Sequence, residues 1–154
     1  MDVLCSLQMP VDDMGNLALT QKEFALRWNV WRALNDWIIM TTNWRNCPVQ
    51  ELVGPVVTGK TDEYAKDAFR MGKANKEDTV VYRLKDAIDE FKKVVPLMEE
   101  VANPALKSRH WKQIFDLLGQ PFSTEVPFSV NNLLDYGVME NIEEVMIMHF
   151  CPYL

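Results

Sequence analysis

The stretch from residue 20 to residue 46 most restricts the fold, because apolar side chains recur at helical spacing on two of its sides. Its start, Thr-Gln-Lys-Glu, has the pattern of a capping box. In such a box Thr20 accepts a hydrogen bond from a first-turn amide and Glu23 reaches back to the Thr20 amide. We therefore predict a helix over residues 20–46 that is packed between neighbouring helices on both sides. One apolar stripe comprises Leu26, Val30, Ala33, Trp37, Met40 and Trp44, and the other comprises Phe24, Trp28, Trp31, Leu34 and Ile38.

Most of the remaining chain is also helical in period, with residues 48–53 no more than a marginal strand. We predict an all-α fold, an elongated bundle of about five helices with short connectors. Residues 20–150 form one domain in this prediction, and residues 1–19 form an irregular lead-in because Pro10, Asp12 and Gly15 break their apolar clusters. The predicted helices cover about residues 20–46, 49–74, 79–101, 104–118 and 130–150, the last broken near residue 137.

Single residues mark several of the predicted helix ends. Asp78 is placed to cap one helix, and Pro96 in the middle of its apolar pattern predicts a kink or restart near Val94 to Val95. Ser129 is placed to cap a later helix, and Gly137 is expected to end its first part.

The run from Asn103 to Gly119 has signals at both ends. Asn103 can accept from first-turn amides, Pro104 suits the first helical position, and Gly119 suits a left-handed residue after the last turn. Within the run, apolar positions fall on one face and charged positions on the other. We therefore predict that Trp111 anchors the core beside a partly buried His110 that a neighbouring carbonyl satisfies.

This run also carries a resemblance to a known family. Leu-Lys-Ser-Arg-His-Trp-Lys-Gln-Ile, preceded by Val-Pro-Leu-Met-Glu-Glu-Val-Ala-Asn-Pro-Ala and followed by Leu-Leu-Gly, resembles the Arg-His-Trp segment in the linker region of dynein heavy chains. The similarity extends from about Phe24 to about Val145, although the chain departs from the family beyond Met146. The matching positions are read as architectural, with Arg109 as a surface or interhelical donor. They are Asn103, Pro104, Leu106, Arg109, His110 and Trp111.

The resemblance implies a function. A dynein linker is a helical lever that lies across the AAA+ ring of the motor and changes angle during the ATP cycle, and it has no catalytic site of its own. The implied partners are other parts of a dynein heavy chain or dynein intermediate and light chains, in the cytoplasm and cytoskeleton. The Asn-Pro-Ala-Leu form before Arg-His-Trp indicates an axonemal, ciliary type. The alternative is a free-standing helical adaptor that binds dynein or axonemal subunits.

A third hypothesis comes from one motif. Gly54-Pro-Val-Val-Thr-Gly59-Lys60-Thr61 matches the phosphate-loop pattern, in which Lys60 would neutralise phosphate oxygens and Thr61 would hold Mg²⁺. The pattern requires a preceding buried strand and a second acidic strand, and the sequence offers neither clearly. We therefore rank a nucleotide-binding protein below the other two hypotheses.

Composition excludes several classes of function. The net charge of −6 disfavours a nucleic-acid or anionic-membrane binder, since such surfaces need excess Lys and Arg. Three distant cysteines and two distant histidines predict no disulfide framework, metal site, cofactor or catalytic set. The last predicted helix has an apolar face without a later element to cover it, which predicts self-association or contact with a partner. That face comprises Ile142, Val145, Met146, His149 and Phe150.

Overall fold

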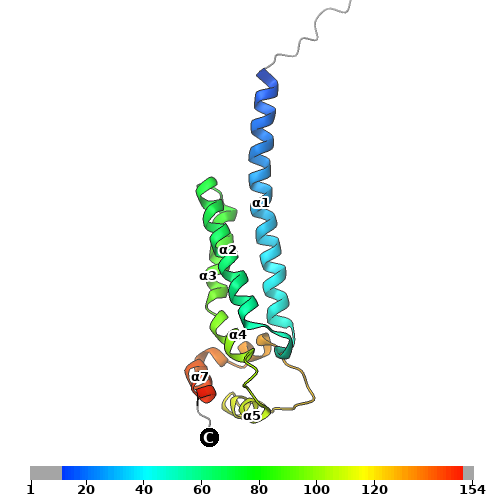
Figure 1. Ribbon diagram of the computed structural model, residues 1–154, viewed down its shortest axis with the longest axis vertical. Coiled ribbons are helices and arrows are strands. Elements are labelled where there is room, and N and C mark those ends of the chain that lie inside the picture. The colour runs from blue at the N-terminus through cyan, green and yellow to red at the C-terminus, as the bar shows by residue number, and fades with distance from the viewer. Residues whose placement is uncertain (1–11, 151–154) are drawn as a thin grey trace, which may run out of the picture.

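A computed structural model describes residues 12–150, and within this range every regular element is helical (Figure 1). The prediction of an elongated all-α fold is therefore confirmed. An isolated antiparallel bridge between Pro48 and Ser129 is the one β-type pairing in the described range. The elements are α1 (Asp12–Asn46), η1 (Val49–Glu51), α2 (Gly54–Ala74), α3 (Thr79–Lys92), α4 (Val95–Val101), α5 (Ser108–Leu117), α6 (Val130–Asp135), η2 (Val138–Asn141) and α7 (Ile142–Phe150).

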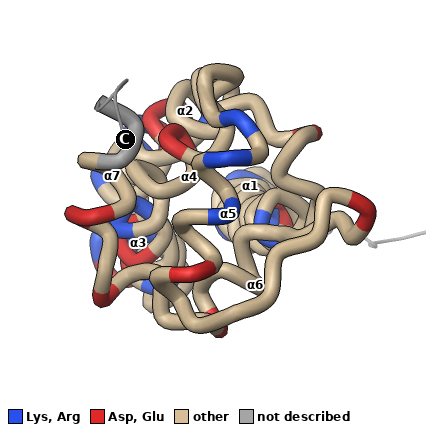
Figure 2. Tube along the Cα trace, turned by 90° about the horizontal axis from the view of Figure 1, so that it is seen from below, with Lys and Arg blue, Asp and Glu red and all other residues tan. Residues whose placement is uncertain are grey.

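The helices form two regions, which we call the shaft and the foot. The shaft consists of α1, α2 and α3 side by side, and the foot consists of α5, α6, η2 and α7 at the lower end of the molecule (Figure 1). Helix α4 continues from α3 and packs against α2. The view from below shows the short helices of the foot spread across the end of the shaft (Figure 2). No helix in the range 12–150 is long and apolar enough to cross a membrane.

Helix α1 begins at Asp12, so the predicted start at Thr20 is wrong. The Thr20 hydroxyl donates to the Asn16 carbonyl at 2.9 Å, which is a bond within a helix rather than a cap. Residues 12–19 can join the helix for two reasons. Acidic residues at the helix start interact favourably with the helix dipole, and an interior glycine such as Gly15 costs only ~1 kcal/mol relative to alanine. Residues 12–19, predicted as irregular, are therefore helical, while residues 1–11 of the predicted lead-in lie outside the described range.

The inner stripe of α1 supplies the core of the shaft. Trp37 is 1% exposed, and its ring lies 5.1 Å from that of Tyr64 in α2 and 5.3 Å from that of Phe91 in α3. Such aromatic pairs contribute ~0.5–1.5 kcal/mol each beyond the burial of their area. Val30 is fully buried against Val80 and Val81, near the other end of α3. The inner stripe therefore joins all three helices.

The outer stripe of α1 is not packed as predicted. Phe24, Trp28, Trp31 and Ile38 are 67%, 58%, 54% and 52% exposed, and only Leu34 of this stripe is half-buried. Helices α2 and α3 both pack on the inner side of α1, which leaves the opposite side uncovered by the described part of the chain. Helical period identifies an apolar face, but it does not show whether the same chain covers it.

Several predicted helix ends are confirmed. Asp78 accepts a hydrogen bond from the Val80 amide at 2.8 Å, and α3 gives way to α4 between Lys92 and Val95. Ser129 accepts from the Asn132 amide at the start of α6. Gly137 has φ +79° and separates α6 from η2.

The last helix, α7, packs on the rest of the foot through Val145. This side chain is 4% exposed, while Ile147 is 65% exposed. Val145 therefore belongs to the core and cannot be the contact for self-association that the sequence predicted. His149 and Phe150, the other predicted contacts near the end of this helix, have side chains that the structure does not describe.

Candidate functional site

The segment with the phosphate-loop pattern forms the first turns of α2. A phosphate loop binds its ligand with backbone amides that point into a loop, whereas amides inside a helix donate to carbonyls four residues earlier. Lys60 pairs with Glu63 at 2.7 Å, and this hydrogen bond raises the pKa of Lys60. The hydroxyl of Thr61 is buried and donates to the Val57 carbonyl at 2.7 Å. Neither side chain is arranged as a phosphate or metal ligand.

Gly54 has a packing role instead. A Cβ atom added at Gly54 would lie 3.2 Å from the Glu99 Cα and 3.7 Å from the Ala102 Cβ. Helices α2 and α4 therefore approach closely at this point, and Thr58 forms a hydrogen bond with Glu99 one turn later. Gly59, in contrast, has open space around it.

The start of the family-like segment is a turn, so the predicted helix start at Pro104 is wrong. Asn103 accepts from the Ala105 amide at 2.9 Å, and the Leu106 amide donates to the Asn103 carbonyl at 3.1 Å. Asn followed by Pro suits the first two positions of a β-turn as well as a helix start. Helix α5 begins only at Ser108.

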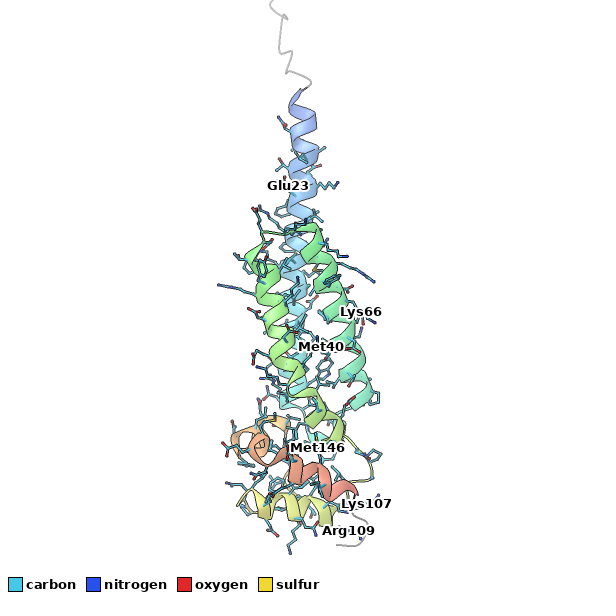
Figure 3. All side chains as sticks on the ribbon, turned by 90° about the vertical axis from the view of Figure 1, so that its left-hand side faces the viewer. Glu23, Met40, Lys66, Lys107, Arg109 and Met146 are labelled. Atoms are coloured by element: carbon cyan, nitrogen blue, oxygen red, sulfur yellow. The ribbon has the colours of Figure 1, made fainter. Side chains whose placement is uncertain are left out.

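His110 stabilises the start of α5. It is half-buried, as predicted, and its Nδ1 accepts from the Lys107 amide at 3.0 Å. The sequence predicted a carbonyl as its partner, whereas this bond joins it to a backbone amide and satisfies a donor at the helix start. The adjacent Arg109 is exposed, and Figure 3 shows Lys107 and Arg109 at the lower end of the molecule.

The end of α5 agrees with the prediction for Gly119. Gly119 has φ +68° and its amide donates to the Asp116 carbonyl at 3.1 Å, while the Gln120 amide donates to the Phe115 carbonyl at 2.9 Å. These two bonds form a Schellman motif, which satisfies carbonyls at the helix end.

Trp111 lies in an aromatic cluster that holds the foot together. It is 9% exposed, and its ring lies 4.8 Å from Phe128 at 68°. Phe115 is 4.9 Å from Phe128 and 5.2 Å from Phe122, with Tyr136 at its edge at 6.1 Å. We name these five residues the foot cluster. The sequence identified only Trp111, although Phe115 follows it at a helical spacing of four.

The foot is fixed to the lower end of the shaft by polar bonds beside the foot cluster. The Val49 amide donates to the Phe128 carbonyl at 3.0 Å. The Asn131 side chain donates to the Asn46 side chain, at the end of α1, at 2.7 Å. The backbone bond and the aromatic contacts meet at Phe128, so this residue is the junction between the two regions.

The described residues offer little for chemistry. Among the described side chains, no three His, Cys, Asp or Glu side chains lie close enough together to hold a metal ion. Cys47 is half-buried, and burial followed by the charge of Glu51 raises the pKa of its thiol. A raised pKa disfavours the thiolate, which is the nucleophilic form.

Comparison with known proteins identifies relatives along almost the entire described range. The model of the family described as "Dynein heavy chain, N-terminal region 2" matches residues 17–149. The Dynein-1-beta heavy chain of the flagellar inner arm I1 complex from Chlamydomonas reinhardtii is 23% identical over 138 residues. Dynein axonemal heavy chain 6 from Homo sapiens is 25% identical over 141 residues, and dynein axonemal heavy chain 8 from Mus musculus is 26% identical over 144 residues. These alignments cover 89%, 91% and 89% of this chain but 3% of each relative.

Proposed function

The chain belongs to the dynein heavy chain family, and on that premise we propose that it is a segment of the linker, a mechanical element of the motor. The observation that carries the proposal is the match over residues 17–149, because this range includes both the shaft and the foot. The match to the family therefore covers both regions of the fold and is not confined to a single motif.

The geometry supports a mechanical role. A lever must transmit displacement along its length without bending at its joints. Here Trp37 ties the three helices of the shaft together, and Phe128 is held in the foot cluster by its ring and to Val49, just after α1, by its carbonyl. Packed cores of this kind deform little, because side chains fill the space between the elements.

In this proposal the segment has no nucleotide site of its own. Residues 54–61 are helical, and Lys60 and Thr61 are engaged by Glu63 and Val57. The energy for movement would come from ATP sites elsewhere in a heavy chain.

The relatives guide the proposed setting. Their names place them in flagellar or axonemal dyneins, so we expect this chain to act in an axonemal dynein complex of a cilium, in contact with other parts of a heavy chain and with intermediate or light chains. The exposed outer stripe of α1 also fits the second candidate, a free-standing helical adaptor. The two candidates differ in whether a motor is covalently attached.

One experiment separates them. An epitope inserted between Thr124 and Glu125, in an exposed connector, should leave the packed helices intact. Cell extract is then sedimented with microtubules without ATP, released with Mg-ATP, and analysed on a denaturing gel. We expect the epitope in the ATP-released fraction, on a polypeptide of heavy-chain size. An epitope on a polypeptide of about this chain's 17.9 kDa in that fraction would favour the adaptor instead. An epitope absent from the fraction would contradict both.

A further inference from the structure

Five of the exposed apolar residues of α1 lie on one continuous stripe. Along the helix they recur at intervals of seven, four, three and seven, which is the spacing of a coiled-coil seam. Each is more than half exposed. We call this set the outer seam, and it comprises Leu17, Phe24, Trp28, Trp31 and Ile38.

The outer seam has the dimensions of a helix-binding surface. From Leu17 to Ile38 it spans about 32 Å at 1.5 Å per residue. The Phe24 and Trp28 rings are stacked at 6.3 Å and 14°, which gives a flat aromatic surface. Taking about 200 Å² for a whole aromatic side chain, the three aromatic residues leave roughly 350 Å² exposed. Apolar patches of this size on monomers often mark interaction sites.

Part of the outer seam projects beyond the other helices. The turn between α2 and α3 lies beside Arg27 and Trp31, with which it lines one groove. The residues of α1 before Arg27 therefore extend past the ends of α2 and α3, and Figure 3 shows Glu23 on this projecting part. A long partner could reach this part of the seam without a clash with α2 or α3.

The charges beside the outer seam identify the chemistry of the partner. In a helical projection of residues 17–39, the two rows that border the seam carry Arg27 on one side and Arg32 on the other. No acidic residue lies in either row over residues 17–39. Asp36 lies further round the helix and is 3.7 Å from Arg32. A partner helix with Asp or Glu beside its apolar residues would therefore match both arginines.

The same charges disfavour a second copy of this chain. In a parallel pair of α1 helices, Arg27 would face Arg32 of the other copy, because flanking positions five residues apart meet across such a seam. In an antiparallel pair each flanking row faces the same row of the other copy, and because neither row holds an acidic residue, neither arginine would face a carboxylate of the other copy. Like charges opposite each other are unfavourable in the parallel arrangement, and the antiparallel arrangement offers the two arginines no acidic partner.

We propose that the outer seam of α1 binds one amphipathic helix of a partner protein, with apolar residues at coiled-coil spacing and Asp or Glu on both flanks. This inference stands on the contacts and charges of α1 and does not depend on the role proposed above. A membrane surface fits less well, because only two arginines border the seam and the chain has a net charge of −6.

Two synthetic helices of 28 residues test the proposal, one with Leu on its seam and Glu on both flanks, and one with Lys in place of every Glu. Like charges keep each peptide monomeric. Fluorescence anisotropy with the full chain at low salt should show at least tenfold tighter binding of the Glu peptide. Phe24→Ser should weaken that binding at least tenfold. The matched change Phe69→Ser, at a residue 58% exposed on α2, should alter it less than twofold. Arg27→Glu with Arg32→Glu should reverse the preference toward the Lys peptide.

Three results would overturn the proposal. The first is equal binding of the two peptides, or no binding of either by chain whose circular dichroism shows it to be folded. The second is dimerisation of the chain in sedimentation that Phe24→Ser abolishes, since the occupant would then be a second copy. The third is binding to phosphatidylserine vesicles that Phe24→Ser abolishes while peptide binding persists unchanged, since the seam would then contact lipid.

Discussion

Replacing Trp111 by Ala should destabilise the chain more than replacing Trp31 by Ala, although the chemical change is the same. Trp111 is 9% exposed within the foot cluster, and Trp31 is 54% exposed on the outer seam. Deleting a large aromatic side chain from a core costs ~3–5 kcal/mol of unfolding free energy. The ring contact with Phe128 at 4.8 Å accounts for ~0.5–1.5 kcal/mol of that cost. Exposed positions usually change stability little, so we expect no more than ~1 kcal/mol for Trp31→Ala.

Urea unfolding followed by far-ultraviolet circular dichroism measures both changes. For a chain of this size, a loss of about 4 kcal/mol at Trp111 corresponds to a melting temperature lower by roughly 8–16 °C. The slope of the urea transition should be the same in the unmodified chain and in the two variants, which would show that the compactness of the unfolded state is unchanged. Equal effects at Trp111 and Trp31 would refute the assignment of the foot cluster as core.

Three further predictions use matched changes. Val145→Glu should unfold the foot because it places an unpaired charge in the core, whereas Ile147→Glu, at an exposed position, should leave the circular dichroism spectrum unchanged. A Val145→Glu variant that dichroism shows to be folded and sedimentation shows to be monomeric would contradict this prediction. A large excess of Mg-ATP should not raise the melting temperature, because residues 54–61 form a helix instead of a phosphate-binding loop. A ligand that bound at 100 times its dissociation constant would add ~2.7 kcal/mol to the unfolding free energy, so a rise that Lys60→Ala abolishes would restore the phosphate-loop hypothesis. Gly137→Ala should lower the unfolding free energy by ~1–2 kcal/mol because φ at this residue is +79°. Gly59→Ala should raise it by ~0.5–1 kcal/mol, because Gly59 lies inside α2 with open space around it. Chemical denaturation that ranks the two variants in the opposite order would show that the two backbone assignments are wrong.

Helical period predicted the inner side of α1 well, because burial in a helix depends on spacing that the sequence displays directly. Val30 and Trp37 lie on the predicted stripe and are fully or almost fully buried. The outer stripe has the same period, yet it is exposed. Period records only that a face is apolar, and the partner that covers it need not lie in the same chain.

The helix starts predicted at Thr20 and Pro104 were wrong because their polar signals have two structural meanings. The Thr20 hydroxyl can cap a helix or bond back to a carbonyl four residues earlier, and it does the second. Asn103 with Pro104 can open a helix or a turn, and here it opens a turn. The local sequence does not separate these outcomes.

The foot cluster was mostly missed for a different reason. Phe122 and Phe128 lie in a connector without regular spacing, so no periodic pattern indicates their burial. Their contacts with Trp111 and Phe115 depend on how the connector returns to the end of the shaft at Val49. Such a path is a property of the three-dimensional fold.

The mechanical role itself is tested most directly in a heavy chain that contains this segment. Phe128→Ala should loosen the junction between shaft and foot, and Phe69→Ala, at an exposed residue of α2, is the matched control. Microtubule gliding velocity and ATP hydrolysis are measured on the same purified protein. The proposal predicts that Phe128→Ala slows gliding while ATP hydrolysis continues, and that Phe69→Ala changes neither. Limited proteolysis shows whether Phe128→Ala has loosened the segment. If the segment is loosened and the gliding velocity is unchanged, a role in transmitting movement is contradicted.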